Sequence, residues 1–567
     1  MSRELRGFSL IEAIVGVALM LLLFLSLFGV LRASLMLSAI AKSKAVAIEL
    51  ASTQMEYLHG LAYDAVGTVG GIPAGLVPQT STSTVDGVPY VTRTYIEYHD
   101  DPADGIGVAD ASGVTTDYKT VKVSVSYSIH GLAKSVSLVS NLVPPGVEST
   151  TGGGTLSIHI VNKDNADVSG ASVQIVNAST SPAINFTTFS NVSGFAIIGG
   201  AATSSEYQVF VSREGYSSAQ TYARTGQNVN PTPGYFTVSK DQTTPSTFQI
   251  DVLSALALLS FSPAVTTTFT DSFTDGTNLA TQTNTQAGGG ALMLTGEALS
   301  GSARSVAIVP DRLTGWGVLS GTLSQPAGST VVVRVDDTNG VPLPDAVLPG
   351  NSAGFSSFPV FLTGLATSSY PGLTLEADIT REATTTVPSI LTWSLSYTEG
   401  LSPVPNISFT LTGAKTIGTN ASDQPIYKTI VNDTTGASAT KTESLEWDSY
   451  TLVLGSANLI ESCPAPPYAQ APGQTSSAAL IVGTPTTNTL PLLIEDAASI
   501  PIPDAKVVLT ADSYAATVPT SSCGIAYFNG LAAGTYTATV SATGYATAVF
   551  PNIAVAGHTA TTPLILP

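Results

Sequence analysis

Charged residues are scarce in this sequence. Only 11% of its 567 residues are Asp, Glu, Lys or Arg, and the 40 acidic residues outnumber the 21 basic ones, giving a formal charge of −19. Five of the basic residues lie among the first 50 positions, so the rest of the chain is acidic. A broad nucleic-acid surface needs clustered Lys and Arg to displace counterions, so we expect no nucleic-acid partner. We interpret the excess of acidic residues as a contribution to solubility, because a net charge far from zero keeps a protein soluble.

Reactive side chains are equally sparse. The chain has two cysteines and five histidines, and it contains no CxxC pair, HExxH motif, GxSxG elbow, P-loop or GxGxxG fingerprint. The histidines are scattered along the chain, at His59, His99, His130, His159 and His558. We therefore expect no enzyme activity, no catalytic residue and no organic cofactor.

The low charge does not indicate disorder, because 43% of the residues are hydrophobic and Val, Ile and Leu recur at strand spacing. At roughly 150 residues per domain, the length predicts about four domains. Abundant Ser, Thr, Ala and Gly are typical of β-rich extracellular modules.

One long apolar segment lies at the N-terminus. Residues 8–31 are apolar except for Ser9, Glu12 and Ser26. As a helix they span about 36 Å at 1.5 Å per residue, enough to cross a hydrocarbon core of about 30 Å. Arg3 and Arg6 precede this segment and favour a cytoplasmic location for that end.

Glu12 interrupts the apolar segment. An acidic side chain at the middle of a membrane helix costs about 2.5–3.5 kcal/mol, and less near the interface, so it indicates a function and a partner. Cleavage between Gly7 and Phe8 would create an ammonium group near Glu12, on a neighbouring subunit if such helices pack in a bundle.

The segment GFSLIEAIVGVALM resembles the cleavage and methylation signature of type IV prepilins and type II secretion pseudopilins. The resemblance implies that a prepilin peptidase cuts after Gly7 and methylates Phe8, and that Glu12 aids docking of each subunit into a filament. It implies other pilins or pseudopilins and an inner-membrane assembly platform as partners. The protein would be a single-pass inner-membrane protein before assembly and part of an extracellular or periplasmic filament afterwards.

Two other interpretations compete with this one. A plain signal anchor would have no use for Glu12. A secretory signal peptide could be cut at Ala39-Ile40-Ala41, but Arg32 separates that site from an apolar segment longer than the usual 7–15 residues.

The helix is expected to continue beyond the membrane to about His59, because Val46, Leu50, Thr53 and Tyr57 recur at steps of four and three. The stretch 47–64 resembles minor pilins and pseudopilins that prime filaments. We therefore expect a leader at 1–7, a transmembrane and assembly helix at 8–60, and a pilin β-sheet domain at 61–145. A linker rich in Pro, Ser, Thr and Gly follows.

A repeat follows the linker. Each copy has a turn containing Pro or Ser with Gly, Asp or Asn, followed by an alternating strand, at Val168–Ile175, Val404–Leu411 and Ile502–Leu509. Gly194 and Gly524 occupy matching turns, and Tyr207 and Tyr536 match on a later strand, with Tyr450 a looser counterpart. These modules resemble carboxypeptidase regulatory-like domains, small sandwiches of the prealbumin type, at 155–250 and 485–567 and more loosely at 401–484.

Residues 256–399 lack this repeat. Their opening, TFTDSFTDG, and the closing strand SILTWSLSY resemble a jelly-roll sandwich of the laminin-G or concanavalin A kind. The expected fold is an α+β pilin domain, with a long N-terminal helix and an antiparallel sheet, followed by all-β sandwich modules of the prealbumin or immunoglobulin-like kind and a jelly-roll.

Cys463 and Cys523 are both expected outside the cytoplasm, where disulfides persist, and we predict a bridge between them. The alternative is two separate buried thiols. Cys523 aligns with Ser193 of the first repeat, so the module itself needs no cysteine there.

Two oxygen-rich loops are candidate calcium sites, because calcium prefers six to eight oxygen ligands. One contains Asp100, Asp101, Asp104 and Asp110, and some pseudopilins bind calcium in a loop of their sheet. The other contains Asp336, Asp337, Asn339 and Asp345. Neither has EF-hand spacing, and a solvated turn is the alternative for both.

The sequence thus favours a minor type IV pilin or pseudopilin that primes a filament or sits at its tip. The alternative is a pilus-tip adhesin that binds a surface glycan or protein receptor through its β-sandwich modules. Fold alone assigns no ligand.

Overall fold

The computed structural model describes residues 10–103, 116–129, 131–144, 153–383 and 386–567. The chain forms two compact units. One unit comprises residues up to 253 together with 416–428, and the other comprises 254–415 together with 429–567. A long apolar helix followed by many β-sheets confirms the coarse fold prediction.

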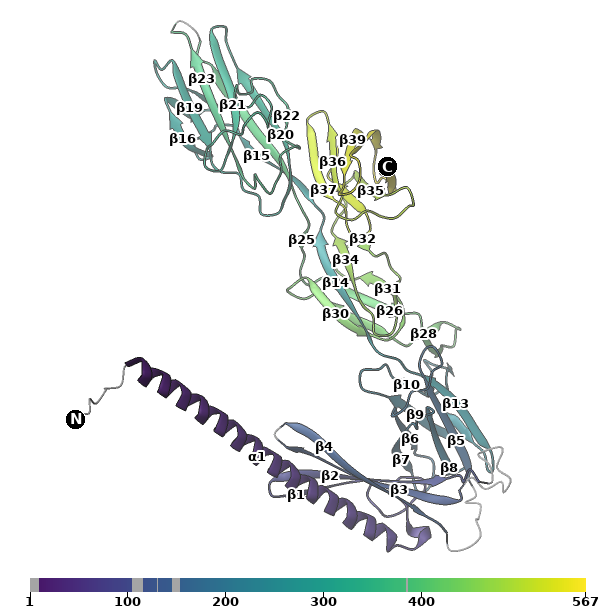
Figure 1. Ribbon diagram of the computed structural model, residues 1–567. Coiled ribbons are helices and arrows are strands. Elements are labelled where there is room, and N and C mark those ends of the chain that lie inside the picture. The colour runs from purple at the N-terminus through teal and green to yellow at the C-terminus, as the bar shows by residue number, and fades with distance from the viewer. Residues whose placement is uncertain (1–9, 104–115, 130, 145–152, 384–385) are drawn as a thin grey trace, which may run out of the picture. The chain divides into compact units, whose positions relative to one another are not determined.

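The first unit begins with helix α1 (Leu10–His59), which ends at the predicted residue. Its second half packs on one face of an antiparallel sheet in which successive strands are neighbours (Figure 1). The helix buries a stripe at steps of three and four that contains Ser43, Ala47, Ala51, Met55 and Leu58. The strands are β1 (Thr80–Val85), β2 (Val88–His99), β3 (Tyr118–Ile129) and β4 (Leu132–Leu142).

The sheet forms because β-branched residues alternate with polar ones. Val121, Val123 and Val125 of β3 are fully buried against the helix, whereas Lys122 and Ser126 are exposed on the opposite face. A short 3-10 turn, η1 (Tyr63–Ala65), leads from the helix toward the sheet.

Three later modules share one topology, although their sequences differ. In each, the first strand pairs in parallel with the last strand and antiparallel with a middle strand. The first module lies at 154–249, the middle module at 254–262 with 402–482, and the last module at 489–565. These three-stranded sets are β13-β5-β8, β34-β14-β30 and β41-β35-β38.

The second sheet of each module also has the same strand order. The three sheets contain β7-β6-β9-β10, β29-β26-β31-β33 and β37-β36-β39-β40. The sandwich cores lie between the two sheets of each module. The first module contains β5 (Gly154–Val161), β6 (Ser172–Asn177), β7 (Ile184–Phe189), β8 (Phe195–Ala201), β9 (Ser204–Ser212), β10 (Ala219–Gln220), β11 (Asn230–Pro231), β12 (Phe236–Val238) and β13 (Thr243–Gln249).

The middle and last modules complete the series. The hairpin β27–β28 belongs to the first unit, where β27 pairs with β11. The strands are β14 (Ser254–Ser262), β25 (Ser402–Pro403), β26 (Ser408–Gly413), β27 (Thr416–Thr419), β28 (Pro425–Tyr427), β29 (Ile430–Thr434), β30 (Thr440–Leu445), β31 (Asp448–Leu454), β32 (Leu459–Cys463), β33 (Tyr468–Gln470), β34 (Thr475–Val482), β35 (Thr489–Glu495), β36 (Lys506–Ala511), β37 (Tyr514–Pro519), β38 (Ile525–Asn529), β39 (Gly534–Ser541), β40 (Ala548–Val555) and β41 (Thr562–Ile565).

The predicted boundary at residue 256 is wrong. Strand β14 belongs to the middle module, where Leu256 and Leu258 are buried in its core, and not to the sandwich that follows (Figure 1, teal among green strands). Without β14, strands β30 and β34 would lack the strand that joins them. The predicted 401–484 module is therefore discontinuous in sequence.

A separate sandwich, residues 265–399, is inserted between β14 and β25, and we call it the inserted sandwich. Its core contains Trp316 and Trp393, both fully buried. One sheet has β15, β17, β18, β20, β22 and β24, and the other has β16, β19, β21 and β23. The strands are β15 (Val265–Asp271), β16 (Leu279–Thr283), β17 (Thr285–Gly288), β18 (Ala291–Leu294), β19 (Ser300–Ser305), β20 (Leu313–Ser324), β21 (Ser329–Asp337), β22 (Val360–Phe361), β23 (Leu373–Arg381) and β24 (Ser389–Glu399).

Candidate functional site

The first half of α1 is apolar on all sides and nothing in the described chain covers it. Leu19, Leu23 and Phe28 are 57%, 69% and 70% exposed. This is the one helix in the described part of the chain that is long and apolar enough to cross a membrane, and its most apolar 18 residues have a mean hydropathy of 2.2. A helix that is apolar all round needs lipid or other helices around it.

The residues predicted to act in cleavage and assembly are Gly7, Phe8 and Glu12. Gly7 and Phe8 fall outside the described residues. Glu12 lies in the first turns of α1, which begins at Leu10, but its side chain is not among those described. Cleavage, methylation and the pairing of Glu12 therefore stay predictions.

The boundary between the free and the packed half of α1 lies near residue 42. Lys42 forms an ion pair with Asp86 at 2.8 Å, with both side chains mostly exposed. The hydrogen bond from Lys42 lowers the pKa of Asp86, but such exposed pairs contribute little stability. Apolar packing of Ala47, Ala51 and Leu58 therefore holds the helix to its sheet.

A buried lysine holds the chain that leaves the helix. The ammonium group of Lys119 donates to the carbonyls of Tyr63 and Val66 at 2.7 and 2.8 Å. It also lies 4.4 Å from the ring centre of Tyr63 and 5.4 Å from that of Tyr98. Burial lowers the pKa of Lys119 to about 8.

Lys119 was not predicted from the sequence, although the sequence contains a signal for it. Lys119 shares the inward-facing register of Val121, Val123 and Val125 on β3. A charged residue in such a register has to find hydrogen-bond acceptors inside the protein. The carbonyls of the loop after α1 supply them.

The loop at residues 66–79 joins the pilin sheet to the first module. The amide of Asn185 on β7 donates to the carbonyl of Gly70 at 2.7 Å. The side-chain amide of Gln79 donates to the carbonyls of both Val69 and Asn185, each at 2.7 Å. Ile72 is buried in the core of the first module. Hydrogen bonds and apolar packing therefore hold the pilin sheet domain to the first module.

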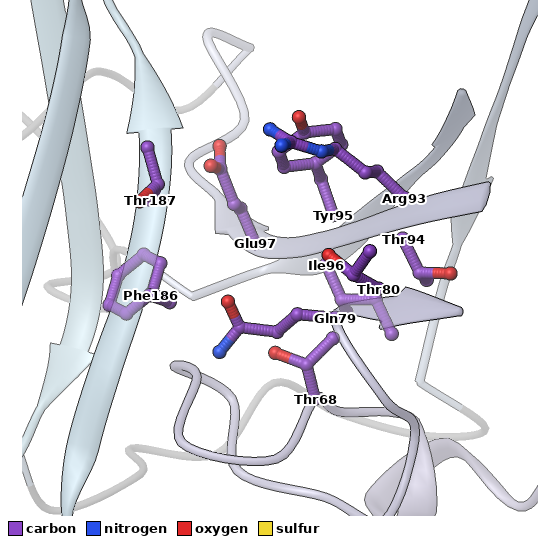
Figure 2. A pocket seen from close by; sticks show the side chains of 10 residues that line it. All are labelled: Thr68, Gln79, Thr80, Arg93, Thr94, Tyr95, Ile96, Glu97, Phe186 and Thr187. Atoms are coloured by element: carbon purple, nitrogen blue, oxygen red, sulfur yellow. The ribbon is translucent and has the colours of Figure 1, made fainter. Parts of the chain in front are cut away.

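Figure 2 shows a hollow of about 180 Å³ beside this loop. Arg93, Tyr95 and Glu97 of β2 line one side, and Phe186 and Thr187 of β7 line the other. Burial raises the pKa of Glu97, whereas Arg93 is exposed. The hollow is a polar seam between two β-sheets.

The structure joins Cys463, the last residue of β32, to Cys523, in the turn before β38. The bridge closes a loop of 60 residues and links the middle and last modules. On the chain-entropy model, a disulfide that closes a loop of this length stabilises the folded protein by about 4 kcal/mol.

The calcium predictions gain no support. Asp104 and Asp110 lie outside the described residues, and Asp101 accepts a hydrogen bond from the amide of Ala103. In the second loop, Asp337 accepts from the amides of Asn339 and Val341 and thus closes a turn. Among the described residues, no three His, Cys, Asp or Glu side chains are grouped to hold a metal ion.

Comparison with known families supports one of the predicted modules. Residues 492–565 match the family model of the carboxypeptidase regulatory-like domain, which confirms the resemblance predicted for 485–567. The match covers less than half of the chain. The search of curated proteins found no matching sequence.

Three solved structures share low similarity with the chain. The Bacillus anthracis TIE protein is 10% identical over 86% of this chain and 73% of that chain, with a TM-score of 0.16. BcpA, the major pilin subunit of Bacillus cereus, is 9% identical over 73% and 99%, with a TM-score of 0.14. The RrgB pilus protein of Streptococcus pneumoniae is 11% identical over 74% and 98%, with a TM-score of 0.12.

TM-scores this low support no argument about shared function. The shared topology of the three modules and the family match at 492–565 together show that the C-terminal segment is similar to carboxypeptidase regulatory-like domains and that the two earlier modules have its strand order.

Proposed function

We propose that this chain is a minor type IV pilin or pseudopilin, anchored in the inner membrane by α1 and then built into a surface or periplasmic filament. Prepilin peptidase cuts after Gly7 and methylates Phe8. Glu12 then pairs with the N-terminal ammonium group of a neighbouring subunit. The assembly platform and other pilins or pseudopilins are the partners.

The observation that carries this proposal is the division of α1 into two halves. Ala47, Ala51 and Leu58 pack on the chain's own sheet, whereas the apolar side chains from Ile14 to Leu37 are left to surroundings the monomer does not provide. A membrane first, and a bundle of like helices later, would supply those surroundings.

The bulk of the chain favours a sparse position in the filament. More than 400 residues follow the pilin sheet. A major subunit repeats closely along a filament, where heads of this size would crowd one another. A subunit at the tip or in a priming position has no row of identical heads beside it, so this crowding does not arise.

Substitutions in the free half of α1 test the proposal. Leu22→Lys and Glu12→Gln should each reduce incorporation into filaments at least tenfold, measured by immunoblot of sheared filaments. Leu76→Lys is the matched control, because Leu76 is 87% exposed in a loop outside the helix. Equal incorporation of all three variants would contradict the proposal.

A second candidate function, adhesion, is favoured by a groove on the inserted sandwich. The groove has a volume of about 530 Å³ and crosses the outer face of the sheet that contains β19, β21 and β23. It is lined by the hydroxyls of Ser300, Ser302, Thr330 and Thr380, with Arg334 and Asp378 paired to each other. Paired charges and many hydroxyls suit a neutral polyhydroxylated ligand such as a glycan.

The two functions separate in one experiment. Ser302→Val with Thr330→Val should abolish attachment to host or abiotic surfaces while leaving filament number unchanged if the groove is adhesive. If attachment is unchanged, the chain acts in assembly without this groove.

A further inference from the structure

The inserted sandwich is joined to the middle module by two short chain segments, one after β14 and one before β25. The chain enters through β14 and returns through β25, and these strands pair only at their ends, Phe261 with Pro403 and Ser262 with Ser402. Two adjacent strands joined by a short ladder form a natural hinge. Some other element has to hold the inserted sandwich if it is to keep one orientation.

The last module contacts the inserted sandwich through polar groups on β36 and β37. The hydroxyl of Thr314 donates to the carbonyl of Thr517 at 2.6 Å, and the amide of Thr517 donates to the hydroxyl of Thr398 at 3.1 Å. The ammonium group of Lys506 donates to the carbonyl of Thr363 at 3.2 Å. Thr517 and Thr398 are almost completely buried, so these bonds are shielded from water.

Two glycines on β20 allow this close approach. A Cβ atom on Gly315 would lie 2.4 Å from the Cβ of Thr517, and one on Gly317 would lie 2.8 Å from the carbonyl oxygen of Ala515. No side chain fits at such distances without moving β37. The missing side chains at 315 and 317 are therefore a requirement of this interface.

The same last module is bound covalently to the middle module. The Cys463–Cys523 disulfide joins β32 to the turn before β38, and the hydroxyl of Ser521 contacts Glu461 at 3.5 Å beside it. A cavity of about 270 Å³ lies here, lined by Ala264 and Leu401 at the two ends of the insertion and by Glu461. The hinge of the inserted sandwich thus adjoins the disulfide.

We propose that the last module is a clamp. One end is locked to the middle module by the Cys463–Cys523 disulfide, and the other end holds β20 and β24 of the inserted sandwich through Thr517. The clamp fixes the inserted sandwich at its hinge, and reduction of the disulfide releases it. This inference does not depend on the proposed filament function.

Hydrogen–deuterium exchange of the full-length protein in detergent tests the clamp. Dithiothreitol, which is oxidised to its cyclic disulfide as both cysteines become thiols, should raise exchange at least tenfold in residues 313–318 and 514–518. The double variant Cys463→Ser with Cys523→Ser should do the same without reductant. If alkylation shows two free thiols and exchange in both segments is unchanged, the proposed role of the disulfide is wrong.

A second pair of variants tests the other end of the clamp. Gly315→Val should raise exchange in residues 313–318 and 514–518, whereas Gly288→Val on β17 should not, because no atom lies within 4 Å of the Cβ position at Gly288. Thr398→Val removes one interface hydrogen bond without adding bulk, and it should raise exchange in the same two segments. It replaces Gly315→Val as the test if Gly315→Val also raises exchange in the sandwich core at 373–379. No change in either variant would overturn the proposal.

Discussion

At the scale of single residues, each of the three modules has a tyrosine that makes the same hydrogen bond at an equivalent position. The hydroxyls of Tyr207, Tyr450 and Tyr536 each donate to a carbonyl four or five residues earlier, at 2.7–3.0 Å. This is the arrangement known as a tyrosine corner. It shows that Tyr450, a loose match in sequence, occupies the same position as the other two.

Two matched glycines give a prediction about the turns of these modules. Gly194 and Gly524 both have φ of +75°, and a Cβ on either would lie 2.6 Å from the carbonyl oxygen of Ile160 or Ile494. Ala at either position should lower the free energy of unfolding of its module by about 2 kcal/mol or more, since it meets both backbone strain and a clash. Urea unfolding monitored by far-ultraviolet circular dichroism measures the free energy of unfolding.

The matched control is Gly544→Ala. Gly544 also has a positive φ, +88°, but no atom lies within 4 Å of its Cβ position. The free energy of unfolding of this variant should fall only by the cost of the left-handed conformation, about 1–2 kcal/mol. A larger loss at Gly544 than at Gly524 would contradict the account of these turns.

Glu461 gives a prediction about pH. Burial raises its pKa from 4.5 to about 7, so the protonated form is favoured in the folded protein. The stability that this group contributes is fully present below pH 4.5 and is lost as the pH rises through 7. Its surroundings include Ser521, Tyr527 and Asp504, and no cation lies among the residues that line the cavity.

Glu461→Gln should therefore stabilise the second unit at pH 8 by about 1–2 kcal/mol, allowing for the part of the side chain that water screens, and should have little effect at pH 4.5. Thermal unfolding at the two pH values measures this difference. Equal effects of the substitution at both would show that Glu461 does not titrate between them.

At the scale of elements, α1 combines two environments in one continuous helix. The sequence predicted the helix, its end near His59 and the apolar segment. It placed the amphipathic stripe one position away from the buried one, because Thr53 and Tyr57 are exposed and Ala47, Ala51 and Leu58 pack on the sheet. It did not predict Lys119 beneath the loop after the helix, because the acceptors of that lysine come from a segment more than 50 residues away.

Overpacking tests how the second half of α1 is held. Ala51 is fully buried against the sheet, whereas Ala45 is exposed on the same helix. Ala51→Leu should lower the free energy of unfolding of the pilin domain by about 1–3 kcal/mol, and Ala45→Leu should leave it nearly unchanged. Chemical denaturation in detergent measures both variants, and equal stabilities would contradict the packing described.

At the scale of the whole molecule, strand periodicity predicted the repeated sandwiches, and the repeat motifs located their second strands. The discontinuity of the middle module was not predictable in the same way. Strand β14 pairs with β34 more than 200 residues later, and no local pattern distinguishes it from a first strand of the inserted sandwich. The predicted boundary at residue 256 therefore precedes the first strand of the inserted sandwich, which begins at Val265.

The cleavage and assembly site stays a prediction from the sequence. The motif that starts at Gly7, with Glu12 inside an apolar segment, indicated processing between Gly7 and Phe8, and both of these residues lie outside the described part of the chain. The hollow beside Glu97 and the clamp at Thr517 depend on contacts between sheets, which only the folded chain brings together.

The most direct test of the central claim is mass spectrometry of the N-terminal peptide of the protein recovered from the cell surface. The account predicts a chain that begins at Phe8 with a methylated amine, since cleavage there supplies the positive charge that Glu12 needs. A chain that begins at Met1, or at Lys42 after cleavage by a signal peptidase, would contradict it.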